Sequence, residues 1–170
     1  MLPVTVVIAD GDKTSRARSL NILQAENGIS VVGVARNGLE AILAADGLKP
    51  HILLLNLNLF KGKGDNLLRT LRRKSPRTRM ILLTRRAFKG PMLEVLSQGA
   101  LGYLNERAIS THLPKAVRQV EAGEAWVPRR MAVRIVDRLS RQTISEEEEG
   151  SLTSFNRLEH NINHLIKESK

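Results

Sequence analysis

Short apolar runs alternate with longer segments of helical spacing along most of the chain. The apolar runs are rich in Val, Ile and Leu and almost uninterrupted by polar residues, which is typical of strands covered on both faces of a parallel sheet. They cover residues 4–9, 29–35, 52–57, 80–84 and 101–104. The pattern therefore predicts five buried strands.

Each run is followed by a segment in which apolar residues recur three or four positions apart, as on one face of a helix. These residues are Leu20 and Leu23; Leu39, Ile42 and Leu43; Leu67, Leu68 and Leu71; Met92, Val95 and Leu96; and Leu113, Ala116, Val117 and Val120. Five strand–helix units predict an α/β fold with a five-stranded parallel sheet, doubly wound so that helices cover both faces.

Ligands and chemistry in such a sheet gather where the strands end, at their carboxyl edge. The segments expected at this edge are residues 10–12, 56–64, 84–89 and 105–108. Candidate functional residues should therefore be sought there.

The pattern changes after Pro128, so we assign residues 1–128 to the α/β domain. Residues 129–139 read as a linker helix with Met131, Ile135 and Leu139 on one face. Residues 140–151 read as an acidic and polar linker, and residues 152–170 as a C-terminal amphipathic helix. The apolar spacing of that last helix spans too few heptads for a coiled coil, and docking on the main domain or on a second subunit is the simpler interpretation.

Charge adds a possible class of partner. The chain of 170 residues has 27 Lys and Arg against 17 Asp and Glu, a net charge of +10, which suggests an acidic partner such as nucleic acid. Residues 69–79 are basic near the amino end of the fourth strand, and Arg85, Arg86 and Lys89 are basic at its carboxyl end. The two sets should form separate patches at opposite edges of the domain, and a solvated surface is the plain interpretation of the first.

Several classes of function are not supported by the composition. The chain has no cysteine, which excludes a disulfide framework, a thiolate metal site and a cysteine nucleophile. Its four histidines show no convincing metal-ligand spacing. No apolar run approaches the length of a membrane span, so we expect a cytoplasmic protein without a membrane partner. Enzymatic activity is not expected, and no catalytic residue is assigned.

The segments at the strand ends carry a family resemblance when their order and spacing are taken together. They are I-A-D at 8–10, V-V-G-V-A-R-N-G-L-E-A at 31–41, K-P-H-I-L-L-L-N-L-N-L at 49–59, I-L-L-T at 81–84, Q-G-A-L-G-Y-L at 98–104 and A-V-R-Q-V-E-A-G-E-A-W-V-P at 116–128. The chain resembles the receiver domains of NarL/LuxR-type response regulators from about residue 4 to residue 139. This resemblance implies a CheY-like, flavodoxin-like (βα)5 receiver with extra C-terminal helices, acting in two-component signal transduction.

The resemblance also implies a phosphorylation site, which this chain has altered. Receivers accept a phosphoryl group on an aspartate after the third strand, with Mg²⁺ held by that residue and an acidic pair after the first strand. A lysine after the fifth strand and a Thr or Ser after the fourth contact the phosphoryl group. The matching residues here are Asp10 and Gly11 for the acidic pair, Asn56 for the acceptor, Thr84, and Glu106 in place of the lysine.

Each of these changes weakens phosphotransfer or the binding of Mg²⁺. An asparagine amide is a poor nucleophile and not an anionic metal ligand, and Mg²⁺ prefers anionic oxygen. Glu106 would repel a phosphoryl group, and Arg85 stands where the family usually has a small residue. Asp12 is a candidate substitute for the carboxylate missing at Gly11, although it lies one residue later in the chain. We therefore expect a degenerate, atypical receiver with neither phosphotransfer nor bound Mg²⁺.

An internal ion pair is expected to close the altered pocket instead. The sign of the charge is reversed at Glu106, and Arg85 and Arg86 add two cations nearby. Either arginine could pair with Glu106 or with Asp10.

These features favour a phosphorylation-independent regulator that works by homodimerisation or protein docking in signalling or transcription control. Tyr103, Phe88 and Arg86 are the residues assigned to its switch or dimer surface, and Tyr103 could also be a static surface residue. DNA contact is expected only through a partner or a C-terminal domain missing from this sequence, because no helix-turn-helix follows residue 151. Two alternatives stay open: a basic nucleic-acid-binding regulator, and a sensor whose ligand occupies the remodelled pocket.

Overall fold

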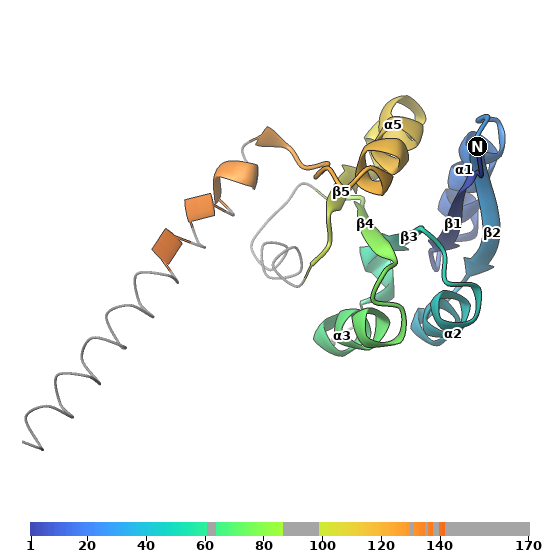
Figure 1. Cartoon of the computed structure of the whole chain (residues 1–170), viewed down its shortest axis with the longest axis horizontal. Helices are drawn as coiled ribbons and strands as arrows, with labels where there is room; N and C mark the ends of the chain where they lie inside the picture. Colours follow the sequence, from blue (N-terminus) through green and yellow to red (C-terminus); the bar gives the residue numbers. More distant parts are fainter. Residues whose placement is uncertain (61–63, 87–98, 130, 135, 138–139, 142–170) are drawn as a thin grey trace, which may run out of the picture. The chain divides into compact units, whose positions relative to one another are not determined.

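The computed structural model describes residues 1–60, 64–86, 99–129, 131–134, 136–137 and 140–141. The chain divides into two compact units, Met1–Pro128 and Arg129–Lys170. The first unit contains the sheet and the helices around it (Figure 1).

Five parallel strands form the sheet, in the order β2-β1-β3-β4-β5. They are β1 (Val4–Ala9), β2 (Ile29–Ala35), β3 (Ile52–Asn56), β4 (Arg79–Thr84) and β5 (Gly102–Asn105). The strand predictions are right to within one residue at every end. The largest shift is at β5, which begins and ends one residue later than the apolar run.

The helices of the described part are α1 (Lys13–Gln24), α2 (Gly38–Leu48), α3 (Gly64–Lys74) and α5 (Ile109–Glu121). Two short 3-10 turns follow strands at the carboxyl edge, η1 (Leu57–Leu59) after β3 and η2 (Glu106–Ala108) after β5. The helix predicted around Met92, Val95 and Leu96 lies outside the described residues. The architecture is the predicted doubly wound (βα) fold.

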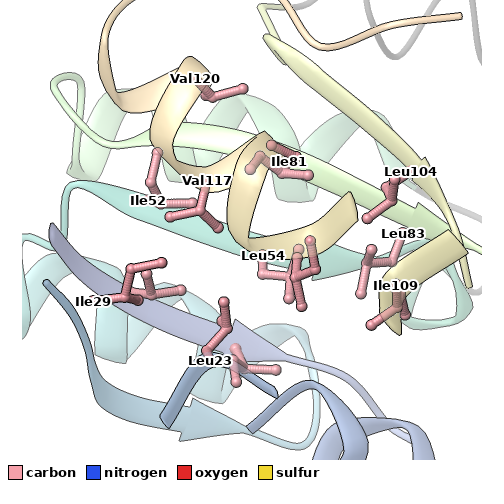
Figure 2. Close-up of a cluster of buried hydrophobic side chains, with 14 residues drawn as sticks. Leu23, Ile29, Ile52, Leu54, Ile81, Leu83, Leu104, Ile109, Val117 and Val120 are labelled. Carbon is pink, nitrogen blue, oxygen red and sulfur yellow. The ribbon is translucent and has the colours of Figure 1, made fainter. Parts of the chain in front are cut away.

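One face of the sheet packs against α1 and α5 and forms a single apolar cluster (Figure 2). Leu54 of β3 and Ile81 of β4 are fully buried there against Leu23 of α1 and Val117 of α5. Strand residues on either side of these, such as Leu53 and Leu55, point to the other face, which α2 and α3 cover (Figure 1). Burial on both faces explains why the strands are almost continuously apolar.

The apolar face predicted for α2 is wrong, although the helix itself is present. Leu39 and Leu43 are exposed at 67% and 62%, whereas Ala41 and Ala45 are fully buried. Small residues let α2 approach the sheet closely, so the larger side chains of this helix are turned to solvent. Size, as well as hydrophobicity, decides which face is buried.

The outer edge of β5 is covered by the segment that follows α5. The amide of Tyr103 donates to the carbonyl of Trp126 at 2.7 Å, and the amide of Trp126 donates to the carbonyl of Leu101 at 2.9 Å. The bridge between Gly102 and Trp126 is parallel, so the segment continues the sheet by one residue pair.

The second unit has helical backbone at the described residues between 129 and 141. Ser140 and Arg141 are helical, so the prediction that a linker begins at residue 140 is wrong at its first two positions. The rest of that linker and the predicted helix at 152–170 lie outside the described residues. None of the helices in the described part of the chain has the length and apolar character needed to cross a bilayer.

Candidate functional site

Polar side chains from three strands meet at the carboxyl edge of the sheet. Asp10 follows β1, Asn56 ends β3 and Glu106 follows β5. Asp10 and Asn56 are buried, with exposed fractions of 0% and 2%, although both are strongly polar. Buried polar groups require partners, and each of these has them.

The side-chain amide of Asn56 bridges two carboxylates. Its Nδ2 donates to Asp10 Oδ2 at 2.9 Å and to Glu106 Oε1 at 2.7 Å. Its Oδ1 accepts the backbone amide of Asn58 at 3.0 Å and so begins η1. Both donors of Asn56 point at negative charge, an arrangement that an aspartate at this position could not reproduce.

The carboxylate of Asp10 is surrounded by donors. Oδ1 accepts the backbone amide of Asp12 at 2.8 Å and the Asn58 side-chain amide at 3.0 Å, and Oδ2 accepts from Asn56. Arg16 donates from Nη1 to the Asp10 carbonyl at 2.7 Å. Hydrogen bonds to an ionised group are among the strong ones, which explains how this charge is tolerated without exposure.

Sequence reasoning did not identify Asn58 as part of the site. The signal available was its place in L-N-L-N-L, two residues after Asn56 and directly beyond the strand end. A turn at that point returns position 58 to the edge where Asp10 lies.

Arg85 joins the loops after β1, β4 and β5. Its Nε lies 2.8 Å from Glu106 Oε2, and its Nη2 lies 3.0 Å from Asp12 Oδ2. These two acidic partners, Glu106 first, raise the pKa of the Arg85 guanidinium. The Arg85 side chain is 60% exposed, so solvent weakens the pairs, and their main effect is to fix three loops relative to one another.

The ion pair differs in part from the predicted one. The structure pairs Arg85 with Glu106, one of the expected combinations. The second partner of Arg85 is Asp12, and the alternative pairing with Asp10 is not used, because amide donors hold that carboxylate. Arg86 forms no ion pair within the described residues; its backbone contacts the Thr84 hydroxyl instead.

Neither Thr84 nor Gly11 contacts a carboxylate of the network within the described residues, although the Gly11 amide donates to Asn58 Oδ1 at 3.4 Å. The Thr84 hydroxyl bonds only to the backbone of Arg86 within the described residues, at 3.3 and 3.4 Å, which caps the end of β4. A Cβ at Gly11 would lie 3.3 Å from Leu59 Cδ2, tighter than an ordinary contact. A carboxylate at position 11 would therefore need Leu59 to move.

The polar side chains at the strand ends engage one another, which bears on the Mg²⁺ site implied by the family resemblance. In the described part of the chain, no group of three His, Cys, Asp or Glu side chains is placed to hold a metal. The N–H groups of Asn56 lie between the Asp10 and Glu106 carboxylates, where a shared cation would have to bind. Both carboxylate oxygens of Asp12 are engaged, Oδ1 by the Ser15 amide and Oδ2 by Arg85.

The predicted switch or dimer surface is only partly described. Tyr103 is buried in this structure, with an exposed fraction of 5%, and its assignment to a switch or dimer surface stays a prediction. Tyr103 lies in β5, whose residues Gly102, Tyr103 and Leu104 are all buried. Arg86 is exposed, and Phe88 lies outside the described residues.

The acidity of Asp12 gives a pH-dependent prediction. A hydrogen bond from the Ser15 amide, and then one from Arg85, hold the pKa of Asp12 below its usual value of 3.8. A lowered folded-state pKa stabilises the protein above the unfolded pKa, and this contribution is lost as the pH falls through the folded-state value.

We therefore expect Asp12→Asn, which keeps a good helix cap but removes the charge, to be less stable than wild type above about pH 4. The difference in melting temperature should shrink as the pH is lowered further. Thermal unfolding of both proteins across the acid range checks this, and a difference that stays constant down to the lowest pH would contradict it.

The strand order and the polar site at the carboxyl ends of the central strands define a flavodoxin-like α/β domain of the CheY type. The family model for the response regulator receiver domain matches residues 6–118, and the chain belongs to this family.

Curated relatives are transcription regulators of the NarL type. The DNA-binding transcriptional activator DevR/DosR of Mycobacterium tuberculosis is 29% identical over 136 residues, which cover 80% of this chain and 63% of the relative. The nitrate/nitrite response regulator NarL of Escherichia coli K12 is 32% identical over 122 residues, which cover 72% of this chain and 56% of the relative. The matched part thus spans about three fifths of these relatives.

Solved structures show the same fold. The receiver domain of the putative response regulator NarL from M. tuberculosis superposes with a TM-score of 0.67 at 25% identity, covering 73% of this chain and all (100%) of that one. The isolated receiver domain of RcsB from Salmonella enterica serovar Typhimurium, determined in the presence of the phosphomimetic BeF3⁻, gives 0.68 at 24% identity, covering 78% and 98%.

Proposed function

We propose that this chain is a pseudo-receiver: a non-enzymatic module of two-component-type signalling and transcription regulation that works without phosphorylation, through dimerisation or protein docking. The observation that carries the proposal is the Asn56 amide, 2.9 Å from Asp10 Oδ2 and 2.7 Å from Glu106 Oε1. The position that accepts the phosphoryl group in the family here serves as a hydrogen-bond donor.

Two further features support the loss of phosphotransfer. An amide nitrogen is a poor nucleophile, and both N–H groups of Asn56 are engaged. Arg85 links the loops that flank the pocket through Asp12 and Glu106. Its positive charge is therefore already paired and is not free to bind a phosphoryl group. A pocket fixed by its own charges does not need a phosphoryl group to order it.

The names of the relatives support the proposed role in transcription control. They are described as a DNA-binding transcriptional activator and a nitrate/nitrite response regulator, which supports a role in transcription control. We propose that this chain acts there as a homodimer or bound to a protein partner, and that it reaches DNA-based regulation through that partner or through another domain.

The test is to add Mg²⁺ and beryllofluoride to the purified chain. We expect no bound-fluoride resonance by ¹⁹F NMR and no change of mass by analytical ultracentrifugation. The RcsB receiver domain, treated in parallel, controls for the activity of the reagent. A bound resonance together with a shift from monomer to dimer would overturn the proposal, because the phosphorylation switch would then still operate.

A further inference from the structure

Three exposed arginines lie on α3 and directly after it, and they take no part in the carboxylate network. Arg69 and Arg73 are four residues apart and therefore lie about 6 Å apart along one face of the helix. Arg77 continues the row in the loop between α3 and β4, and all three side chains are exposed. We call Arg69, Arg73 and Arg77 the α3 arginine row.

No described carboxylate pairs with the α3 arginine row. Within the described residues, none of its three members forms an ion pair, whereas Arg36, Arg85 and Arg118 elsewhere each pair with a carboxylate. The neighbouring Lys74 has only a long contact of 3.7 Å to Asp46. Unpaired cations on one surface repel one another, so an external anion should bind favourably there.

Helix stability explains only part of the row. Cations in the last turn of a helix interact favourably with its macrodipole, which accounts for Arg73. It does not account for Arg69, a full turn earlier, or for Arg77, which lies beyond the helix end at Lys74.

The surroundings of the row favour a phosphate polymer over an acidic protein. Protein interfaces bind through a core of buried apolar and aromatic side chains. Among the described residues, the large exposed apolar side chains lie on other elements, such as Leu39 and Leu43 on α2, and none lies on α3. Contacts to a nucleic-acid backbone need only cations and polar donors, and arginine is well suited to phosphate.

We propose that the α3 arginine row binds the phosphate backbone of nucleic acid without reading its sequence. The row lies on the face of the sheet opposite α1 and α5 (Figure 1), so this surface is separate from the α1–α5 face and from the pocket at the strand ends. The inference does not depend on the loss of phosphorylation.

The test measures the salt dependence of binding to a labelled DNA duplex of about 20 base pairs by fluorescence anisotropy, with the full chain. Each phosphate neutralised contributes about −0.9 to the slope of log K against log salt. Arg69→Gln/Arg73→Gln should make the slope less negative by about 1.8, so wild type loses roughly 12-fold more affinity than the variant between about 50 and 200 mM salt. Glutamine keeps the helix propensity, and circular dichroism checks the fold.

The matched control is Arg18→Gln/Lys115→Gln, which removes the same charge from exposed positions on α1 and α5. We expect its slope to equal that of wild type. Equal losses in the two double variants would overturn the proposal, because net charge rather than the row would then be responsible. So would binding of poly-L-glutamate with the affinity of DNA, which would identify an acidic polypeptide as the partner.

Discussion

Asn56→Asp, the change that restores the residue expected in the family, should destabilise this protein at neutral pH by roughly 2–4 kcal/mol. The new carboxylate would replace an amide that donates to Asp10 at 2.9 Å and to Glu106 at 2.7 Å. Three carboxylates would then meet in a pocket where Asp10 is fully buried. Like charges at such distances, away from water, cannot all ionise without cost.

The loss of stability in Asn56→Asp should depend on pH, and it should be larger at higher pH. The neighbouring acids and burial should raise the folded-state pKa of the new carboxylate above its unfolded value. A raised carboxylate pKa destabilises the protein at higher pH, and the deficit shrinks as the pH falls through the folded-state value. Urea unfolding at about pH 7 and about pH 5 should therefore show a smaller difference from wild type at the lower pH.

Asn105→Asp is the matched control. Asn105 also ends a strand and accepts a backbone amide two residues on, from Arg107 at 2.9 Å, but its side-chain amide donates to no carboxylate of the described residues. We expect it to change stability by less than about 0.5 kcal/mol. If Asn56→Asp were equally harmless, the donor role of Asn56 would be wrong. Adding Glu106→Lys to Asn56→Asp should recover part of the loss by reversing one of the three charges.

The second large effect is expected from Leu54→Ala. Leu54 lies on the central strand β3, is fully buried, and packs in the cluster formed with α1 and α5 (Figure 2). Truncation removes apolar contacts and leaves a cavity between rigid neighbours, which typically costs about 2–5 kcal/mol.

Leu43→Ala on α2 provides the comparison for the same chemical change on the surface. Its side chain is 62% exposed, so we expect a loss below about 0.5 kcal/mol by urea unfolding. Similar losses for the two leucines would contradict the assignment of the core.

Hydrophobic pattern alone identified the strands: β1, β3 and β4 are largely buried, and the edge strand β2 is apolar although Val32 and Val34 are exposed. The same reasoning misjudged α2, since the alanines that allow close packing carry little hydrophobic signal beside Leu39 and Leu43. Which face a helix buries depends on the space that the sheet leaves, and that space is a property of the assembled layers.

The candidate site was predictable as a set of positions but not as a set of bonds. Strand ends placed Asp10, Asn56 and Glu106 at one edge, and charge reversal suggested Arg85 as a partner. The roles of Asn58 and of Asp12 were not predictable, because they depend on turns that direct side chains over distances of a few ångströms. The sequence shows that position 56 carries an amide, but only the geometry shows that this amide donates to Asp10 and Glu106.

The short pairing of Trp126 with β5 has a practical consequence for cutting the domain out of the chain. Similarity to the family model ends at residue 118, ahead of the segment that covers the outer edge of β5. A fragment that stops there would leave the backbone amide of Tyr103 and the carbonyl of Leu101 without their partners at the end of the sheet. Open strand edges recruit strands from other molecules, so such a fragment should self-associate, whereas one that retains residues through Pro128 keeps the edge closed.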